Sequence, residues 1–103
     1  VILAVIAKIT PNHKIPAVEQ LMSAAALAQN LLIGANALGY GAQWLTGWAA
    51  YDREILALLG LQEHEQIVAF VHLGTPQAPT APRERPKYEH LVRQWQPADT
   101  TAG

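Results

Sequence analysis

Cysteine is absent from this sequence of 103 residues, and only 15% of its residues are charged. Without cysteine the chain has neither a disulfide framework nor a thiolate zinc site, so we expect a reducing compartment, the cytoplasm. The histidines lack the i, i+4 pairing of a helical metal site, and no metal is expected. A net charge of −1 provides no long-range field for polyanions or anionic lipids, which argues against nucleic acid and membrane partners.

The sequence also lacks the patterns of two targeting segments. The opening run "VILAVIAKI" has no basic region before it and does not resemble a signal peptide. Gln29, Asn30 and Asn36 interrupt the apolar stretch of residues 17–38 before it reaches the roughly 18 residues of a membrane span. Half of all residues are nevertheless hydrophobic, more than a lone domain of this size usually needs, which predicts a missing partner.

The order of secondary-structure signals predicts a mixed α and β fold. An apolar, β-branched run over residues 1–9 indicates a buried strand, and a helix is expected over 17–38. A short strand over 42–45, a short helix capped by Asp52 and a second long strand over 66–73 follow. Because a strand opens the sequence with no preceding element, we expect the chain to be the C-terminal piece of something longer.

The predicted long helix carries few polar residues, and most of its circumference is apolar. Such a helix is buried on several sides, as the central helix of a larger domain or the seam of a dimer would be. After the last strand we expect an extended, proline-punctuated arm with a short helical turn near residues 88–95. Residues 98–103, "ADTTAG", are expected to form a disordered tail.

The segment "ALGYGAQWLTGWAAYD", residues 37–52, places three glycines and two tryptophans after the helix. A small residue followed by glycine, as at Thr46 and Gly47, lets the main chain approach a flat ring closely, and exposed amides there can donate to a heteroaromatic nitrogen. Trp44 and Trp48 are suited to wall such a ring. On composition alone, both tryptophans are explained better as core aromatics.

Three stretches together resemble the nitroreductase-like flavoprotein family. They are "NHKIPAVEQLMSAAALAQNLLIGANALGYGAQWLTG", "IVAFVHLGTPQ" and "RERPKYEHLV", and the resemblance covers nearly the whole chain. It implies an α+β fold in which a mixed or antiparallel sheet packs against a long central helix, here without the N-terminal part of the fold. Residues 1–97 are then the C-terminal portion of a single nitroreductase-like domain.

The resemblance also implies a function, namely an FMN-dependent oxidoreductase in which hydride from NADH or NADPH passes through FMN to a nitroaromatic, quinone or related acceptor. It implies a homodimer with FMN in the interface and no catalytic side chain, because the flavin carries the chemistry. The implied cofactor-binding residues are Trp44, Leu45, Thr46, Gly47, Arg83 and Arg85. The resemblance implies that the amides at Thr46 and Gly47 face the flavin N5 and that Trp44 lies against the cofactor. It also implies that the two arginines hold the phosphate.

The sequence departs from the family in one respect, since it contains no Arg-x-Ser motif of the kind that binds the phosphate and ribityl chain. An alternative is therefore a truncated, non-catalytic dimerisation or scaffold domain with an incomplete flavin site. Arg83 and Arg85, which flank Glu84, also have an alternative role in solvating the arm.

Overall fold

The structure is a computed structural model that describes residues 1–79 and 81–98. Its sheet consists of three strands, β1 (Ile2–Lys8), β2 (Gly41–Leu45) and β3 (Glu65–Gly74), in the order β1-β3-β2. Both outer strands are antiparallel to β3, so β1 and β2 run in the same direction with β3 between them. The helix α1 (Ala17–Ala37) connects these two parallel strands, which makes a split β-α-β unit.

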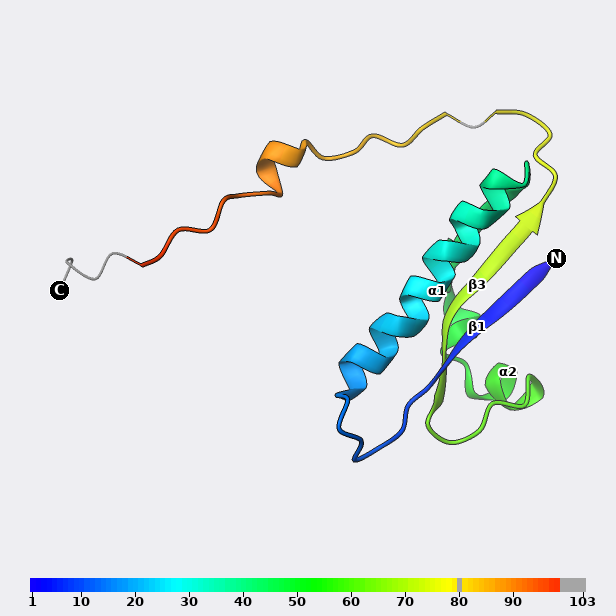
Figure 1. The fold of residues 1–103 in the computed structure, drawn as a ribbon. Coiled ribbons are helices and arrows are strands. Elements are labelled where there is room, and N and C mark those ends of the chain that lie inside the picture. The colour runs from blue at the N-terminus through cyan, green and yellow to red at the C-terminus, as the bar shows by residue number, and fades with distance from the viewer. Residues whose placement is uncertain (80, 99–103) are drawn as a thin grey trace.

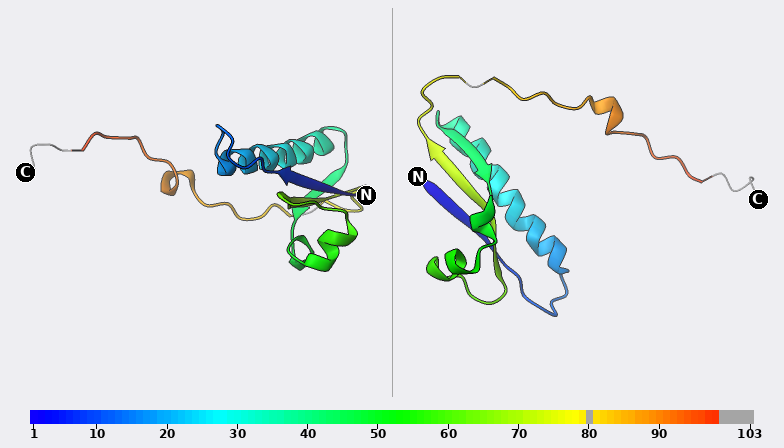
Figure 2. Two further views of the ribbon diagram at one scale, coloured as in Figure 1. Left: turned by 90° about the horizontal axis from the view of Figure 1, so that it is seen from below. Right: turned by 180° about the vertical axis from the view of Figure 1, so that it is seen from behind.

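These elements confirm the predicted α+β class, and each predicted strand and helix is present with ends within one or two residues. The long helix α1 covers one face of the sheet, while the 3-10 turn η1 (Trp48–Ala50) and the short helix α2 (Arg53–Leu58) lie at the other face (Figures 1 and 2). Among the described residues, α1 contacts all three strands, whereas α2 contacts only η1. The second face of the sheet is therefore only partly covered.

The core lies between α1 and the sheet. Val5 of β1, Ala28 of α1, and Ala69 and Val71 of β3 are buried there, and Trp44 packs against them from β2. Alanine at both position 28 and position 69 leaves room for the helix axis to approach the central strand closely. The register places Val5 opposite Ala69 and Trp44 opposite Val71, and paired residues of antiparallel strands point to the same face.

Polar side chains fasten the ends of the helices. The Gln20 carboxamide accepts from the Thr10 amide at 2.8 Å and donates to the Thr10 carbonyl at 3.1 Å, so it ties the start of α1 to the end of β1. Asp52 is the N-cap of α2, as predicted, and its Oδ1 accepts from the amides of Glu54 at 3.0 Å and Ile55 at 3.1 Å. Both contacts satisfy main-chain groups that the elements leave unpaired.

The outer surface of α1 is apolar and open to solvent within one chain. Ala28 is the one α1 residue classed as buried, whereas the side chains of Met22 and Ile33 are 61% and 58% exposed. Met22 and Ile33 lie within about 20° of each other on the helical wheel, on the side away from Ala28. The predicted burial of this helix on several sides is thus not achieved by the described residues alone. No helix among residues 1–79 and 81–98 has the length and apolar character needed to cross a membrane.

Residues 75–79 and 81–98 form an arm that leaves the end of β3 and runs away from the rest of the molecule (Figure 1). The described residues of the arm are all exposed, and its single 3-10 turn, η2 (Tyr88–His90), contacts no other helix or strand. The radius of gyration is 18.9 Å, against about 13 Å for a compact chain of this length. The predicted helical turn near residues 88–95 is confirmed over its first residues. Except for Ala98, the predicted disordered tail lies outside the described residues.

Candidate cofactor site at the end of β2

The residues of the predicted cofactor site follow one another at the end of β2. Trp44 and Leu45 are the last two residues of the strand, and Thr46 and Gly47 lead out of it into η1. Leu45 is 42% exposed, Thr46 is half-buried and Gly47 is exposed. We call residues 45–47 the β2 corner. Two of its three residues are exposed, so the β2 corner lies at the surface of the chain.

The direction of the main-chain amides in the β2 corner follows from the register of the sheet. Leu73 exchanges two hydrogen bonds with Val1, at 2.8 and 3.0 Å, so the polar main-chain groups of Leu73 face the β1 side. Along β3 this direction alternates, so the main-chain groups of residues 70 and 72 face β2. Phe70 is one of these, and it is paired with Leu45. The polar groups of Leu45 therefore face β3, and the N–H of the next residue, Thr46, faces the free edge of the sheet.

Neither Thr46 nor Gly47 donates its amide hydrogen to another group within residues 1–79 and 81–98. An unpaired main-chain N–H that is accessible costs little in water, but it is ready to bind an acceptor atom of a ligand. The β2 corner thus presents two consecutive main-chain donors.

Gly47 has a backbone conformation that other residues rarely adopt, with φ of 62° and ψ of −169°. This combination is essentially restricted to glycine, because a Cβ atom would clash with the residue's own main chain. A Cβ atom built on Gly47 would meet no atom within 4 Å, so the space beside the main chain is open. A planar ring can therefore approach the backbone at Gly47, and we refer to this open stretch of main chain as the Gly47 cradle.

Trp44 is held in place at the base of the β2 corner. Its side chain packs with the core on the α1 side of the sheet, and its Nε1–H donates to the Val68 carbonyl at 3.2 Å. Val68 belongs to the part of β3 that extends past the last β2–β3 pair, Leu45 with Phe70, so β2 does not pair with its carbonyl. The indole therefore combines the core role favoured by composition with a position next to the candidate site.

Two exposed aromatic side chains follow the β2 corner. Trp48 and Tyr51 are 72% and 74% exposed, so both rings are available to a ligand or another chain. Tyr51 also lines a hollow of about 480 Å³ between α1 and η1, with Leu21, Leu56 and Val68 among the other lining residues. Sequence reasoning did not single out Tyr51, although its place four residues after Gly47 on a short connection was a usable signal.

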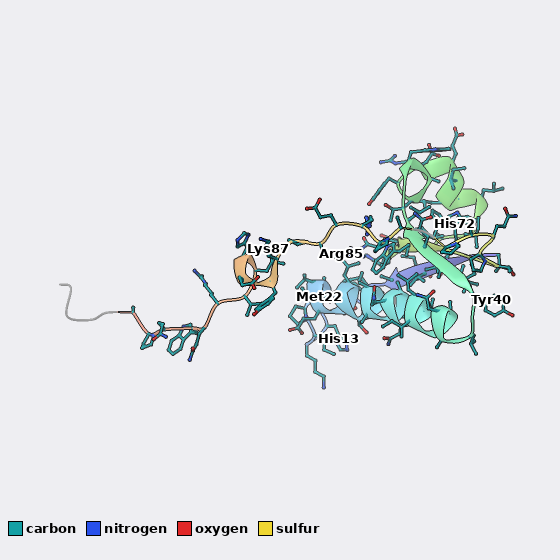
Figure 3. The ribbon with its side chains drawn as sticks, turned by 90° about the horizontal axis from the view of Figure 1, so that it is seen from above. His13, Met22, Tyr40, His72, Arg85 and Lys87 are labelled. Atoms are coloured by element: carbon teal, nitrogen blue, oxygen red, sulfur yellow. The ribbon has the colours of Figure 1, made fainter. Side chains whose placement is uncertain are left out.

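Arg83 and Arg85 lie apart from the β2 corner within one chain. Both belong to the arm, and Figure 3 shows Arg85 and Lys87 on it, outside the layers of α1 and the sheet. The structure therefore brings together four of the six predicted site residues, Trp44 to Gly47, and leaves the two arginines on a separate segment. Among the described residues, no polar or charged side chain is buried, and no three histidine or acidic side chains gather as a metal site would require.

Helix α1 packs on an antiparallel sheet, and one strand of that sheet ends in open amides and the Gly47 cradle. This arrangement is suited to binding a flat, heteroaromatic cofactor. Residues 2–75 match the family model described as "Nitroreductase family", which covers more than half of the chain. The chain belongs to the nitroreductase family. This confirms the family suggested by the sequence motifs.

Individual relatives agree with this result. YdjA of Escherichia coli strain K12, a protein assigned as an NAD(P)H nitroreductase, is 38% identical over 76 residues, covering 74% of this chain and 42% of the relative. A protein of Haemophilus influenzae with the same assignment is 31% identical over 75 residues, covering 72% of this chain and 41% of the relative. The chain thus spans less than half the length of these relatives.

Solved structures show the same fold. The nitroreductase-like family protein from Bacillus cereus superposes with a TM-score of 0.79 at 22% identity, covering 89% of this chain and 49% of that one. The NADPH:FMN oxidoreductase of Vibrio harveyi, solved with NAD⁺, gives a TM-score of 0.69 at 23% identity, covering 97% of this chain and 49% of that one. The nitroreductase-like fold is therefore established for this chain.

Proposed function

We propose that this chain forms part of an FMN-dependent oxidoreductase, in which hydride from NADH or NADPH is passed to a nitroaromatic, quinone or related acceptor. Membership of the nitroreductase family and the relatives' assignments support the reaction class. The observation that carries the proposal is the β2 corner, where two unpaired amides and the Gly47 cradle are open to a planar ring. The cytoplasm remains the proposed location.

The residues of the corner have distinct roles in this proposal. FMN supplies hydride transfer when it is bound. The N–H groups of Thr46 and Gly47 would donate to the flavin ring system, Leu45 would contribute apolar contact, and Trp44 holds the main chain of the corner in place through its bond to Val68. No side chain of the chain is required as an acid or base.

The arginines of the arm are proposed to bind the FMN phosphate. Guanidinium groups match the geometry of phosphate oxygens, and Arg83 and Arg85 are both exposed on the arm. In one chain they lie apart from the corner, so the proposal requires either movement of the arm or the arm of a second copy.

We further propose that the protein is a homodimer, with FMN in the interface. The exposed apolar side of α1, which includes Met22 and Ile33, supports this part of the proposal. Exposed apolar surface of this extent is typical of an interaction site.

The test is to purify the protein expressed from its complete coding sequence and to add FMN. The flavin absorbance at about 450 nm and the oxidation of NADH and NADPH are then recorded. We expect a flavin band, and oxidation that accelerates when a quinone or nitroaromatic is added. A colourless protein that oxidises neither nucleotide would contradict the proposal and would favour the scaffold alternative.

A paired variant tests the phosphate contacts. Replacing both arginines, in R83Q/R85Q, should weaken FMN binding by about tenfold or more, since each charge-assisted hydrogen bond contributes about 1.5–3 kcal/mol. Arg53→Gln is the matched control, because Arg53 is exposed on α2 and lies outside the proposed site. Equal FMN affinity in the two variants would remove the arginines from the site.

A further inference from the structure

The hollow between α1 and η1 combines an apolar interior with a polar rim, and we call it the Tyr51 hollow. Its volume of about 480 Å³ lies within the range of small-molecule sites in proteins. The buried residues of its lining, Ala50 and Ile67, are apolar, whereas its two polar lining residues, Tyr51 and Gln66, are exposed. A molecule in the hollow would therefore meet apolar groups at its inner part and hydrogen-bonding groups at its outer part.

The hollow is present because β2 is shorter than β3. The pairing of β2 with β3 ends at Leu45 and Phe70, so among the described residues the edge of β3 at residues 66–68 has no neighbouring strand on that side. The first half of α1 lines the resulting space with Leu21 and Ala25, and η1 and α2 line it from the other face of the sheet. The space past the end of β2 is thus enclosed by α1, β3 and the connection that follows β2.

Two contacts connect the Tyr51 hollow to the β2 corner. Trp48 follows Gly47 directly, and the Tyr51 amide donates to the Trp48 carbonyl at 3.1 Å, which closes the turn η1. Side chains three residues apart in a 3-10 turn lie one above the other, so both exposed rings are on the same side of η1. In addition, Trp44 of the corner donates to the carbonyl of Val68, which lines the hollow. The hollow is therefore continuous with the candidate cofactor site.

The chemistry of the lining indicates what the hollow can bind. None of the lining residues that the structure describes is charged, so an anionic group inside would lose its hydration without gaining a cationic partner. The Tyr51 hydroxyl and the Gln66 carboxamide at the rim are both able to donate a hydrogen bond to a carbonyl oxygen. The hollow is thus suited to a neutral aromatic molecule with carbonyl oxygens at its edge.

We propose that the Tyr51 hollow binds the electron acceptor, and that this acceptor is a neutral, planar quinone. The quinone ring contacts Tyr51 and the apolar lining, and a carbonyl oxygen lies at the rim with Gln66. This inference rests on the proposed function, in which a quinone gains one hydride, supplied by NADH or NADPH through FMN, and one proton from water, and leaves as the hydroquinone. It adds the charge of the acceptor and the residues that select it.

The test is to measure binding of menadione, a neutral naphthoquinone, by calorimetric titration. The protein is expressed from its complete coding sequence, loaded with FMN and kept free of NADH and NADPH, so that no reaction occurs. Tyr51→Ala should weaken binding about three- to tenfold, because contacts between aromatic rings contribute on this scale. Tyr51→Phe retains the ring and should stay within about twofold of the unmodified protein. Tyr40→Ala is the matched control, because Tyr40 is exposed and precedes β2 at the end opposite to the corner.

Filling the hollow provides a second test. Ala25→Leu adds bulk from α1 at little cost in helix propensity and should weaken menadione binding at least about tenfold. Ala57→Leu, at an exposed position of α2 outside the lining, is its matched control. The urea midpoint of each variant is measured, and where Ala25→Leu destabilises the protein, the exposed Tyr51 decides the test.

The charge of the ligand provides a third test. A naphthoquinone sulfonate of the same ring size should bind at least about tenfold more weakly than menadione, because its negative charge has no partner in the hollow. Equal affinity for the two quinones would overturn the proposal. So would an affinity for menadione that Tyr51→Ala, or a stably folded Ala25→Leu, leaves at the value of its control.

Bound FMN is measured on the same samples by absorbance. Retained FMN with menadione binding that is insensitive to Tyr51→Ala contradicts the acceptor site alone. Menadione binding that depends on Tyr51 in a protein that binds no FMN keeps the hollow as a quinone site and contradicts only the proposed enzymatic function.

Discussion

Replacing Gly47 with alanine tests the backbone on which the candidate site depends. The open space beside this residue means that the added methyl group meets no neighbouring atom. The cost therefore arises from the backbone itself, because φ of 62° with ψ of −169° is essentially a glycine conformation. Holding alanine in such a conformation costs about 1–3 kcal/mol.

Two responses to this substitution are possible, and both are measurable. If the β2 corner keeps its conformation, the free energy of unfolding in urea falls by about 1–3 kcal/mol while FMN affinity is nearly retained. If the corner relaxes instead, stability is preserved, but the amides of Thr46 and Gly47 turn away, and we expect FMN affinity to fall about tenfold or more. The sum of the two losses should be similar in either case.

The control for Gly47→Ala is Gly34→Ala. Gly34 is helical within α1 and also has no atom within 4 Å of an added Cβ. Alanine there should stabilise the protein by about 0.5–1 kcal/mol without changing FMN affinity. Unfolding in urea and FMN titration by fluorescence are carried out on both variants of the complete protein. If Gly47→Ala changes neither stability nor FMN affinity, the reasoning about the corner is refuted.

Two further predictions concern other parts of the molecule. Asp52→Ala removes the cap of α2 and should lower the free energy of unfolding by about 1 kcal/mol, whereas an unchanged urea midpoint would show that the cap contributes nothing. Trp44→Phe deprives the Val68 carbonyl of its donor and should cost about 1–3 kcal/mol by the same measurement, and a smaller loss would mean that water replaces the indole.

Local patterns in the sequence were sufficient to predict most elements of the fold. The apolar run before Lys8, the cap at Asp52 and the β-branched stretch of β3 each have a local physical cause, and all were located correctly. The position of β3 between β1 and β2 was not predicted, because strand order depends on pairing between residues far apart in the chain. For the same reason, the bond from Trp44 to Val68 could not be inferred from spacing.

The candidate site was predictable only in part. The Thr46-Gly47 pair is adjacent in sequence, so its position at a strand end could be expected from local signals. The Thr46 amide lacks a partner because it faces the free edge of the sheet, and this direction depends on the register of β2 against β3, which is a property of the whole sheet. The separation of Arg83 from the corner likewise depends on where the arm packs, and no local pattern specifies this.

The strand order has a consequence for how the protein is made. Within the part of the chain that the structure describes, β1 and β2 pair with β3 and not with each other, and β3 is the last of the three in the sequence. On the ribosome, these pairings between the described strands can form only once residues of β3 have left the exit tunnel. Until then α1 is the one long element among the described residues that can form from local contacts, and the apolar strands β1 and β2 on either side of it are exposed to chaperones and to other nascent chains.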